Sequence, residues 1–155
     1  MNKVLFVCRA NVCRSPMAEA IFNALAEDAG LDLRAESAGV AALEGGAMDV
    51  KARTALEELG IYPGAHRARQ VTRALVEEAD LVLTMSLRQH ATLLDGYGAS
   101  PSRTHTLPAH SDNTRDREEI ADPHGQSLQA YRASSRSILS YVDGIVSRAV
   151  TDVKR

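Results

Sequence analysis

The sequence predicts an α/β fold in which helices flank a parallel sheet. An apolar run without polar interruption covers residues 4–8, residues 81–85 form the clearest later strand, and helical segments follow both. An uninterrupted apolar strand is typical of a parallel sheet that is buried on both faces. Strands that alternate with helices indicate right-handed crossovers within one sheet. The chain has 155 residues, enough for one domain with its own core, and we place that domain at residues 1–155.

The first strand runs through a tight polar turn straight into a helix. Pro16 suits the start of that helix, and Ser15 is expected to be its N-cap. Helical spacing predicts that its apolar face contains Met17, Ala20, Ile21, Ala24 and Leu25. Residues 31–38 predict a second strand, and their alternating charges place it at an edge of the sheet.

The rest of the chain continues the alternation. A helix carries Ala52, Ala55, Leu56 and Leu59 on its apolar face, and a short helical piece is expected at residues 72–78. The strand at residues 81–85 leads to a helix at 87–94 and a short strand at 104–107. Residues 110–119 are polar and expected to be mobile, whereas the last segment has the spacing of a long packing helix after Gly125.

Composition excludes several classes of function. The formal net charge of −2 gives no reason to expect nucleic acid or an anionic membrane as a partner. The apolar run at 4–8 is too short to cross a bilayer, so we expect a cytoplasmic protein, monomeric or weakly dimeric. Cys8 and Cys13 are too few for a disulfide framework, and no His or further Cys stands at the spacing of a zinc site. We therefore expect no metal and no cofactor.

The turn after the first strand has the features of an anion-binding loop with a nucleophile. Cys8 and Arg14 are separated by five residues, and Ser15-Pro16 follow the arginine. Phosphate is bound by converging backbone N–H groups, a helix N-terminus and a planar guanidinium, and this segment offers all three. A thiol in such a field is expected to ionise and become nucleophilic. The alternative is that Cys8 is simply buried at the end of a strand, as free cysteines usually are. That alternative does not explain why Asn11, Arg14, Ser15 and Pro16 follow Cys8 at fixed spacings.

The sequence from Cys8 to Pro16 resembles the low-molecular-weight protein-tyrosine phosphatases, a family that includes bacterial protein-arginine phosphatases. Later stretches resemble further motifs of the family in the same order: Ser37-Ala38-Gly39, the residues HRARQ at 66–70, ADLVLTM at 79–85 and Asp122-Pro123. The resemblance implies a three-layer sandwich with a four-stranded parallel sheet in the order 2-1-3-4. It also implies that the phosphate-binding loop follows the first strand.

The resemblance further implies hydrolysis of phosphorylated protein through a phosphocysteine intermediate. Cys8 would be the nucleophile and Arg14 would bind the phosphoryl oxygens, while Asp122 would protonate the leaving group and then activate water. Supporting roles would fall to Asn11, which tolerates a left-handed backbone, and to Ser37 and His66, which would hydrogen-bond to it. Ser15 would donate a hydrogen bond to the Cys8 sulfur.

The predicted pocket mouth departs from the tyrosine-specific pattern. The substrate-binding positions implied by the resemblance are Arg9, Ala10, Asn11, Val12, Cys13, Ser15, Leu43 and His124. His124 and Leu43 stand where such members have aromatic residues. Val12 has no hydroxyl that could position a guanidinium, so we favour phosphotyrosine and keep phosphoarginine as the alternative substrate. Cys13 is either a packed loop residue or a resolving thiol for oxidised Cys8.

Two other classes of function remain as alternatives. An arsenate reductase would relay oxidation through further cysteines, and the chain has none after Cys13. A non-catalytic phosphate-binding module would explain the loop but would leave Asp122 without a role. Other phosphate-binding motifs are absent, since the sequence contains neither GxxxxGK[ST] nor GxGxxG.

Overall fold

The computed structural model describes residues 2–111 and 119–154 and contains one parallel sheet. Its strands are β1 (Lys3–Cys8), β2 (Arg34–Gly39), β3 (Leu81–Thr84) and β4 (Thr104–Thr106), in the order β2-β1-β3-β4. β1 pairs with β2 over its whole length, so that Cys8 lies opposite Gly39, and it pairs with β3 on its other side. The predicted order is confirmed, and the charged second strand lies at an edge.

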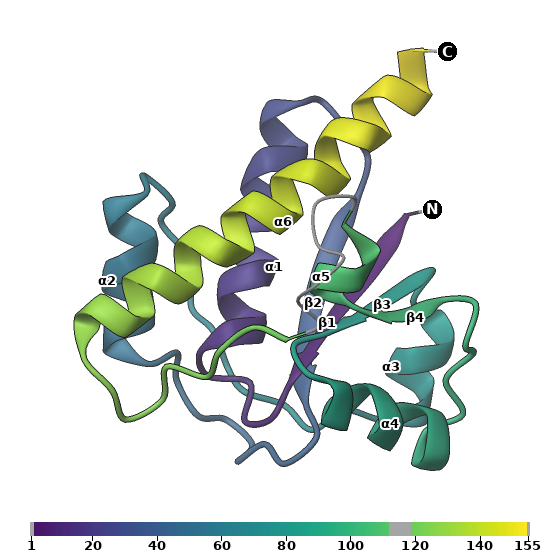
Figure 1. Ribbon diagram of the computed structural model, residues 1–155, viewed down its shortest axis with the longest axis horizontal. Coiled ribbons are helices and arrows are strands. Elements are labelled where there is room, and N and C mark those ends of the chain that lie inside the picture. Colours follow the sequence, from purple (N-terminus) through teal and green to yellow (C-terminus); the bar gives the residue numbers. More distant parts are fainter. Residues whose placement is uncertain (1, 112–118, 155) are drawn as a thin grey trace.

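Helices cover both faces of the sheet. They are α1 (Arg14–Asp28), α2 (Val50–Glu58), α3 (Arg73–Glu78), α4 (Leu87–Gly96), α5 (Leu107–His110) and α6 (Leu128–Lys154). α1, α2 and the long α6 lie on one side of the sheet, and α3 and α4 lie on the other (Figure 1). The three layers therefore match the predicted sandwich. Among the residues that the structure describes, no helix is long and apolar enough to cross a membrane.

The core is divided by the sheet into two apolar clusters. Alternate side chains of a strand point to opposite faces, so Val4 and Phe6 pack with α1 and α6. Leu5 and Val7 pack on the side of α3 and α4. The Phe6 ring meets Phe22 of α1 edge to face, with their centroids 5.9 Å apart. Residues 4–8 of β1 are thus buried on both faces of the sheet, and this fixes the position of the loop that follows them.

The start of α1 differs from the prediction. The N-cap is Cys13, which makes no side-chain capping hydrogen bond, and Ser15 lies inside the first turn. The prediction of Ser15 as N-cap is wrong because its hydroxyl is 2.8 Å from the Cys8 sulfur. The buried side of α1 is also wider than predicted, since the helix is enclosed by the sheet and α6. The fully buried residues of α1 include three that were not predicted, Ala18, Phe22 and Ala26. The predicted residues Ala20, Ala24 and Leu25 are half-buried.

The remaining elements begin close to the predicted positions. Asp49, Thr72, Ser86 and Thr106 cap α2, α3, α4 and α5 by accepting a backbone N–H with the side chain. The predicted strand at 104–107 ends at Thr106, because the next residue begins α5. Most of the segment 110–119, which we expected to be mobile, lies outside the described residues.

Candidate active site

The loop between β1 and α1 curls around the Cys8 sulfur. Cys8 lies at the end of β1 and is only 3% exposed. The backbone N–H of Asn11 donates to its Sγ at 3.3 Å, and the Ser15 hydroxyl lies 2.8 Å from the same atom. The sulfur therefore lies inside the curl of the loop, with a backbone N–H directed at it. The predicted contact between Ser15 and Cys8 is present.

Asn11 holds the curl of the loop in place. Its φ is 60°, the left-handed conformation that the sequence predicted, and it is completely buried. Its amide nitrogen donates to Ser15 Oγ and Ser37 Oγ, both at 2.9 Å, and its amide oxygen accepts the Arg69 N–H at 3.0 Å. His66 Nε2 lies 2.7 Å from the Asn11 carbonyl oxygen. The predicted contacts of Ser37 and His66 are therefore confirmed, and each such bond contributes roughly 1 kcal/mol.

A second set of contacts supports Ser37. Its hydroxyl donates to Glu19 Oε1 at 2.6 Å, and Arg69 Nε donates to its carbonyl oxygen at 3.0 Å. Arg69 also pairs with Glu36 at 3.3 Å. Neither Glu19 nor Arg69 was predicted from the sequence to support the loop. Glu19 lies one helical turn after Ser15, so its place on the same face of α1 was the available signal.

Gly39 brings the edge strand β2 against the loop. A Cβ at this position would lie 2.5 Å from the Arg9 carbonyl oxygen. The backbone continues the contact, since Val40 N–H donates to the Cys8 carbonyl and Ala41 N–H donates to the Arg9 carbonyl. Glycine here allows a close approach of two backbones, and this approach gives the loop a rigid floor.

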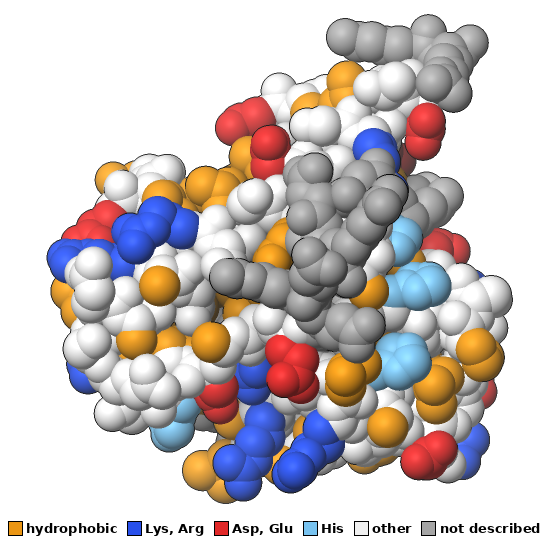
Figure 2. Space-filling model, viewed as in Figure 1, with side chains coloured by type: hydrophobic (Ala, Val, Ile, Leu, Met, Phe, Trp, Pro, Cys, Tyr) orange, Lys and Arg blue, Asp and Glu red, His pale blue; other side chains and the backbone are white. Residues whose placement is uncertain are grey.

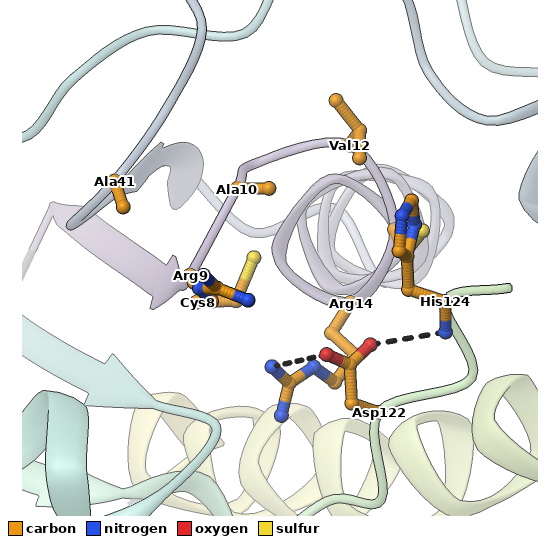
Figure 3. Close-up of a pocket in the computed structure, with 9 residues that line it drawn as sticks. Cys8, Arg9, Ala10, Val12, Arg14, Ala41, Asp122 and His124 are labelled. Carbon is orange, nitrogen blue, oxygen red and sulfur yellow. Dashed lines mark hydrogen bonds and ion pairs between the residues drawn. The ribbon is translucent and has the colours of Figure 1, made fainter.

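Arg14 and Asp122 meet above the loop from distant parts of the sequence. Arg14 is 6% exposed, and its Nη1 donates to the Ile120 carbonyl at 2.9 Å. Its Nη2 lies 3.5 Å from Asp122 Oδ2. The other carboxylate oxygen of Asp122 accepts the His124 backbone N–H at 3.1 Å (Figure 3). The loop before α6 therefore carries Asp122 into the site and fixes its carboxylate there.

These groups line one cavity of about 240 Å³ (Figure 3). Its walls are Cys8, Arg9, Ala10, Val12, Cys13, Arg14, Ala41, Asp122 and His124. Asn11 and Ser15 do not line the cavity, because they are buried in the network that supports the loop. Leu43, which we predicted as substrate-binding, is not among the lining residues either, and its side chain is 83% exposed. The place of Leu43 at the pocket mouth, which the sequence resemblance implies, therefore stays a prediction.

The surroundings of the cavity are electropositive. An adjoining cavity shares Arg9, Arg14 and Ala41 with the first and adds Arg88 from α4. Figure 2 shows basic side chains gathered at the lower edge of this face, where Figure 1 shows the loop after β1. Clustered guanidinium groups at the carboxyl end of parallel strands attract an anionic ligand to this edge.

Cys13 forms a different, neutral part of the wall. Its thiol donates to the Tyr131 hydroxyl at 3.8 Å, and that hydroxyl donates to Asp49 Oδ2 at 3.1 Å. Burial raises the pKa of the Cys13 thiol to about 12, and the Asp49 carboxylate acts in the same direction. Burial likewise raises the pKa of Tyr131 above its usual range. Asp49 and Tyr131 were not predicted as site residues, because in the sequence Asp49 looks like a helix cap and Tyr131 looks like a core aromatic residue.

A thiol at the base of a tight turn, a buried guanidinium beside it and a carboxylate across the cavity define the site of a cysteine-dependent phosphatase. The geometry contains what attack on phosphorus needs: a nucleophile, a binding group for charged oxygens and a group that carries a proton.

Comparison with known proteins agrees with this class. The model of the family "low molecular weight phosphotyrosine protein phosphatase" matches residues 3–154. A protein-arginine-phosphatase of Bacillus subtilis is 36% identical over 129 residues, which cover 83% of this chain and 84% of the relative. The crystal structure of a low-molecular-weight protein tyrosine phosphatase from T. tengcongensis superposes with a TM-score of 0.90 at 34% identity, covering 96% of this chain and 99% of the other.

A third similar protein is the YwlE arginine phosphatase, in a mutant form with a phosphorylated active-site serine. Its TM-score is 0.88 at 31% identity, with 94% of both chains covered. The chain described here belongs to the low-molecular-weight phosphotyrosine protein phosphatase family. It is accordingly a hydrolase that acts on phosphorylated protein.

Proposed function

We propose that residues 1–155 form one catalytic domain, which hydrolyses phosphotyrosine in proteins through a phosphocysteine on Cys8. This proposal rests on one observation: Cys8, Arg14 and Asp122 line the same cavity. In the first step the Cys8 thiolate attacks phosphorus, and the bond from phosphorus to the tyrosine oxygen breaks. Backbone N–H groups of the loop and the Arg14 guanidinium bind the phosphoryl oxygens, while the Asp122 carboxyl gives its proton to the departing phenolate.

The second step releases inorganic phosphate. The Asp122 carboxylate takes a proton from a water molecule, whose oxygen attacks phosphorus as the phosphorus–sulfur bond breaks. The Ser15 hydroxyl, 2.8 Å from the Cys8 sulfur, stabilises the thiolate as it leaves. The phosphorylated active-site serine of the YwlE mutant supports an intermediate of this kind, because serine in that position holds a phosphoryl group.

The side wall of the cavity bears on the choice of substrate. Ala10, Val12 and Ala41 give it an apolar surface against which a phenyl ring can pack. The N–H groups of a guanidinium would find no acceptor on these three side chains, and unpaired polar groups are costly to bury. Phosphoarginine is the second candidate substrate, favoured by the similarity to the protein-arginine-phosphatase of Bacillus subtilis and by Asp122 as an acceptor for a guanidinium.

The test compares phosphotyrosine and phosphoarginine peptides of otherwise identical sequence. We expect a higher kcat/KM for the phosphotyrosine peptide and no turnover of either peptide by Cys8→Ser. Asp122→Asn is expected to slow phosphoenzyme formation by about 10²–10⁴-fold with little change in substrate affinity, since it removes the proton donor. Preferred turnover of phosphoarginine would establish the second candidate, and activity that survives Cys8→Ser would refute both.

The location, oligomeric state, cofactor requirement and partners of the enzyme stay predictions. We expect a cytoplasmic monomer or weak dimer that needs no cofactor and binds neither nucleic acid nor membranes. Its partners in this proposal are phosphorylated proteins or peptides, which the basic edge formed with Arg9 and Arg88 would attract through their negative charge.

A further inference from the structure

Three side chains near the cavity have the donor atoms of a transition-metal site. The Cys13 sulfur, a carboxylate oxygen of Asp49 and a ring nitrogen of His124 all lie within 4.8 Å of one another. They come from the loop before α1, the N-cap of α2 and the loop before α6, respectively. No metal-ligand spacing along the sequence connects these three residues, and for this reason we expected no metal from the sequence.

We propose that Cys13, Asp49 and His124 form a binding site for Zn²⁺, and that zinc bound there closes the substrate cavity and inhibits the enzyme. Thiolate, imidazole and carboxylate are the ligands that zinc takes in proteins, with a fourth position left to water in sites of three residues. The mixture of one sulfur, one nitrogen and one oxygen favours zinc over magnesium or calcium, which prefer oxygen alone.

The geometry requires only a small adjustment. Ligand atoms about 2.0–2.3 Å from a tetrahedral zinc lie about 3.5 Å from one another. The separations of up to 4.8 Å would therefore have to close by at most about 1.3 Å. His124 can supply this movement because its side chain is exposed, whereas Cys13 is buried and Asp49 is half-buried. On binding, the Cys13 thiol would release its proton to solvent and leave the thiolate on zinc.

Tyr131 is placed to orient two of the three ligands. Its hydroxyl lies 3.8 Å from the Cys13 sulfur and 3.1 Å from Asp49 Oδ2. The other oxygen of Asp49 accepts the Lys51 backbone N–H at 2.8 Å, which fixes the carboxylate at the start of α2. Hydrogen bonds of this kind from outside the ligand shell set the direction of metal ligands and raise affinity.

The position of this cluster connects metal binding to activity. Cys13 and His124 line the same cavity as Cys8, and the His124 backbone N–H donates to Asp122. A zinc ion bound to Cys13 and His124 would occupy the part of the cavity that these two residues line, and it would restrict the loop that carries Asp122. The substrate side chain would then be excluded, so inhibition should be competitive. The inhibitory part rests on the proposed function, whereas the binding part does not.

The binding test uses Co²⁺ as a coloured substitute for zinc in the Cys8→Ser variant. The chain has two cysteines, so in this variant a thiolate-to-cobalt charge-transfer band can come only from Cys13. We expect that band at one Co²⁺ per chain, and its loss when Zn²⁺ is added. Adding His124→Gln should weaken cobalt binding at least about tenfold. The matched control is His105→Gln, on β4, whose ring stacks on His110, and it should leave binding unchanged.

The outcome of this titration does not depend on any enzymatic assay. Absence of the band in Cys8→Ser would overturn the proposal. Equal cobalt affinity in His124→Gln and His105→Gln would also overturn it, because the metal would then bind elsewhere. If no phosphopeptide were turned over, the proposed function would fail, and the titration would still decide whether the metal site exists.

Inhibition is tested with Asp49→Asn in the chain that retains Cys8. Asparagine serves equally well as an N-cap, because its amide oxygen can accept the Lys51 N–H, so α2 is kept while the anionic ligand is lost. The amide nitrogen would then donate to the Tyr131 hydroxyl in place of the bond that Asp49 Oδ2 accepts. We expect the inhibition constant for Zn²⁺ to rise at least about tenfold, with activity without zinc retained and with reversal by a chelator in both proteins. An unchanged inhibition constant would show that zinc acts on Cys8 directly and would overturn the inhibitory part.

Discussion

Gly39→Ala is the sharpest probe of how the sheet supports the catalytic loop. The alanine Cβ would lie 2.5 Å from the Arg9 carbonyl oxygen and 3.0 Å from backbone atoms of Ala10 and Asn11. All three neighbours are main-chain atoms, so no flexible side chain can move aside. Ordinary contact begins near 3.4 Å. Residues 9–11 or strand β2 must therefore move by roughly 0.9 Å, the difference between these two distances.

This movement has consequences for both stability and rate. Overpacking of a close contact costs about 1–3 kcal/mol, which in a domain of this size lowers Tm by roughly 2–12 °C. The same movement displaces the N–H groups that surround the Cys8 sulfur. Because a misplacement of about 1 Å in a catalytic group can cost about 10²-fold, we expect kcat/KM to fall by a factor of that order.

The assay measures kcat/KM on a phosphopeptide together with Tm. Gly96→Ala is the matched control, because a Cβ there meets nothing within 4 Å and Gly96 ends helix α4 far from the loop. Because a Cβ at Gly96 displaces no backbone, this variant should leave the rate unchanged and keep or slightly raise Tm. A Gly39→Ala enzyme with wild-type Tm and kcat/KM would refute the reasoning. A lower Tm with an unchanged rate would show that β2 moves and the loop does not.

Two further predictions concern groups that support the site. Ser37→Ala leaves one N–H of the buried Asn11 amide without its acceptor, so the free energy of unfolding should fall by about 1–3 kcal/mol in urea titrations. Burial raises the pKa of the Cys13 thiol from 9.0 to about 12. The neutral thiol therefore adds to the free energy of unfolding, and this contribution is complete below pH 9.0 and is lost as the pH rises toward 12. Urea unfolding at pH 8 and pH 11 should therefore show a smaller loss of stability in Cys13→Ala than in the wild type; equal losses would contradict this.

The sequence predicted those parts of the fold and the site that depend on local patterns. The apolar side chains at residues 4–8 and 81–83 indicate buried strands, because consecutive apolar residues place side chains that avoid water on both faces of the sheet. Cys8, Arg14 and Ser15 lie within one turn, so their spacing alone brings them together. The N-cap prediction for Ser15 was wrong because a serine hydroxyl can form a hydrogen bond either with the N–H groups at a helix start or with a nearby sulfur. The spacing of residues along the sequence does not show which of the two bonds forms.

Long-range contacts are the part that local patterns could not supply. Asp49 and Tyr131 are 82 residues apart and meet only after α2 and α6 pack together. The close approach of Gly39 to Arg9 depends on the register between β1 and β2, in which Cys8 lies opposite Gly39. Nothing near Leu43 in the sequence shows that its loop turns the side chain outward. Such features need the packed structure, because they result from the relative placement of whole elements.

The pairing of Arg14 with Asp122 explains how one site can hold a buried cation and still receive an anion. A buried guanidinium without a partner is strongly destabilising, and the Arg14 side chain is only 7% exposed. Before substrate arrives, Asp122 at 3.5 Å and the Ile120 carbonyl at 2.9 Å act as its partners. A phosphoryl group in the cavity would replace Asp122 as the anion next to Arg14. The Asp122 carboxyl, released from the ion pair but still held by the His124 N–H, would then be free to carry a proton to the leaving group.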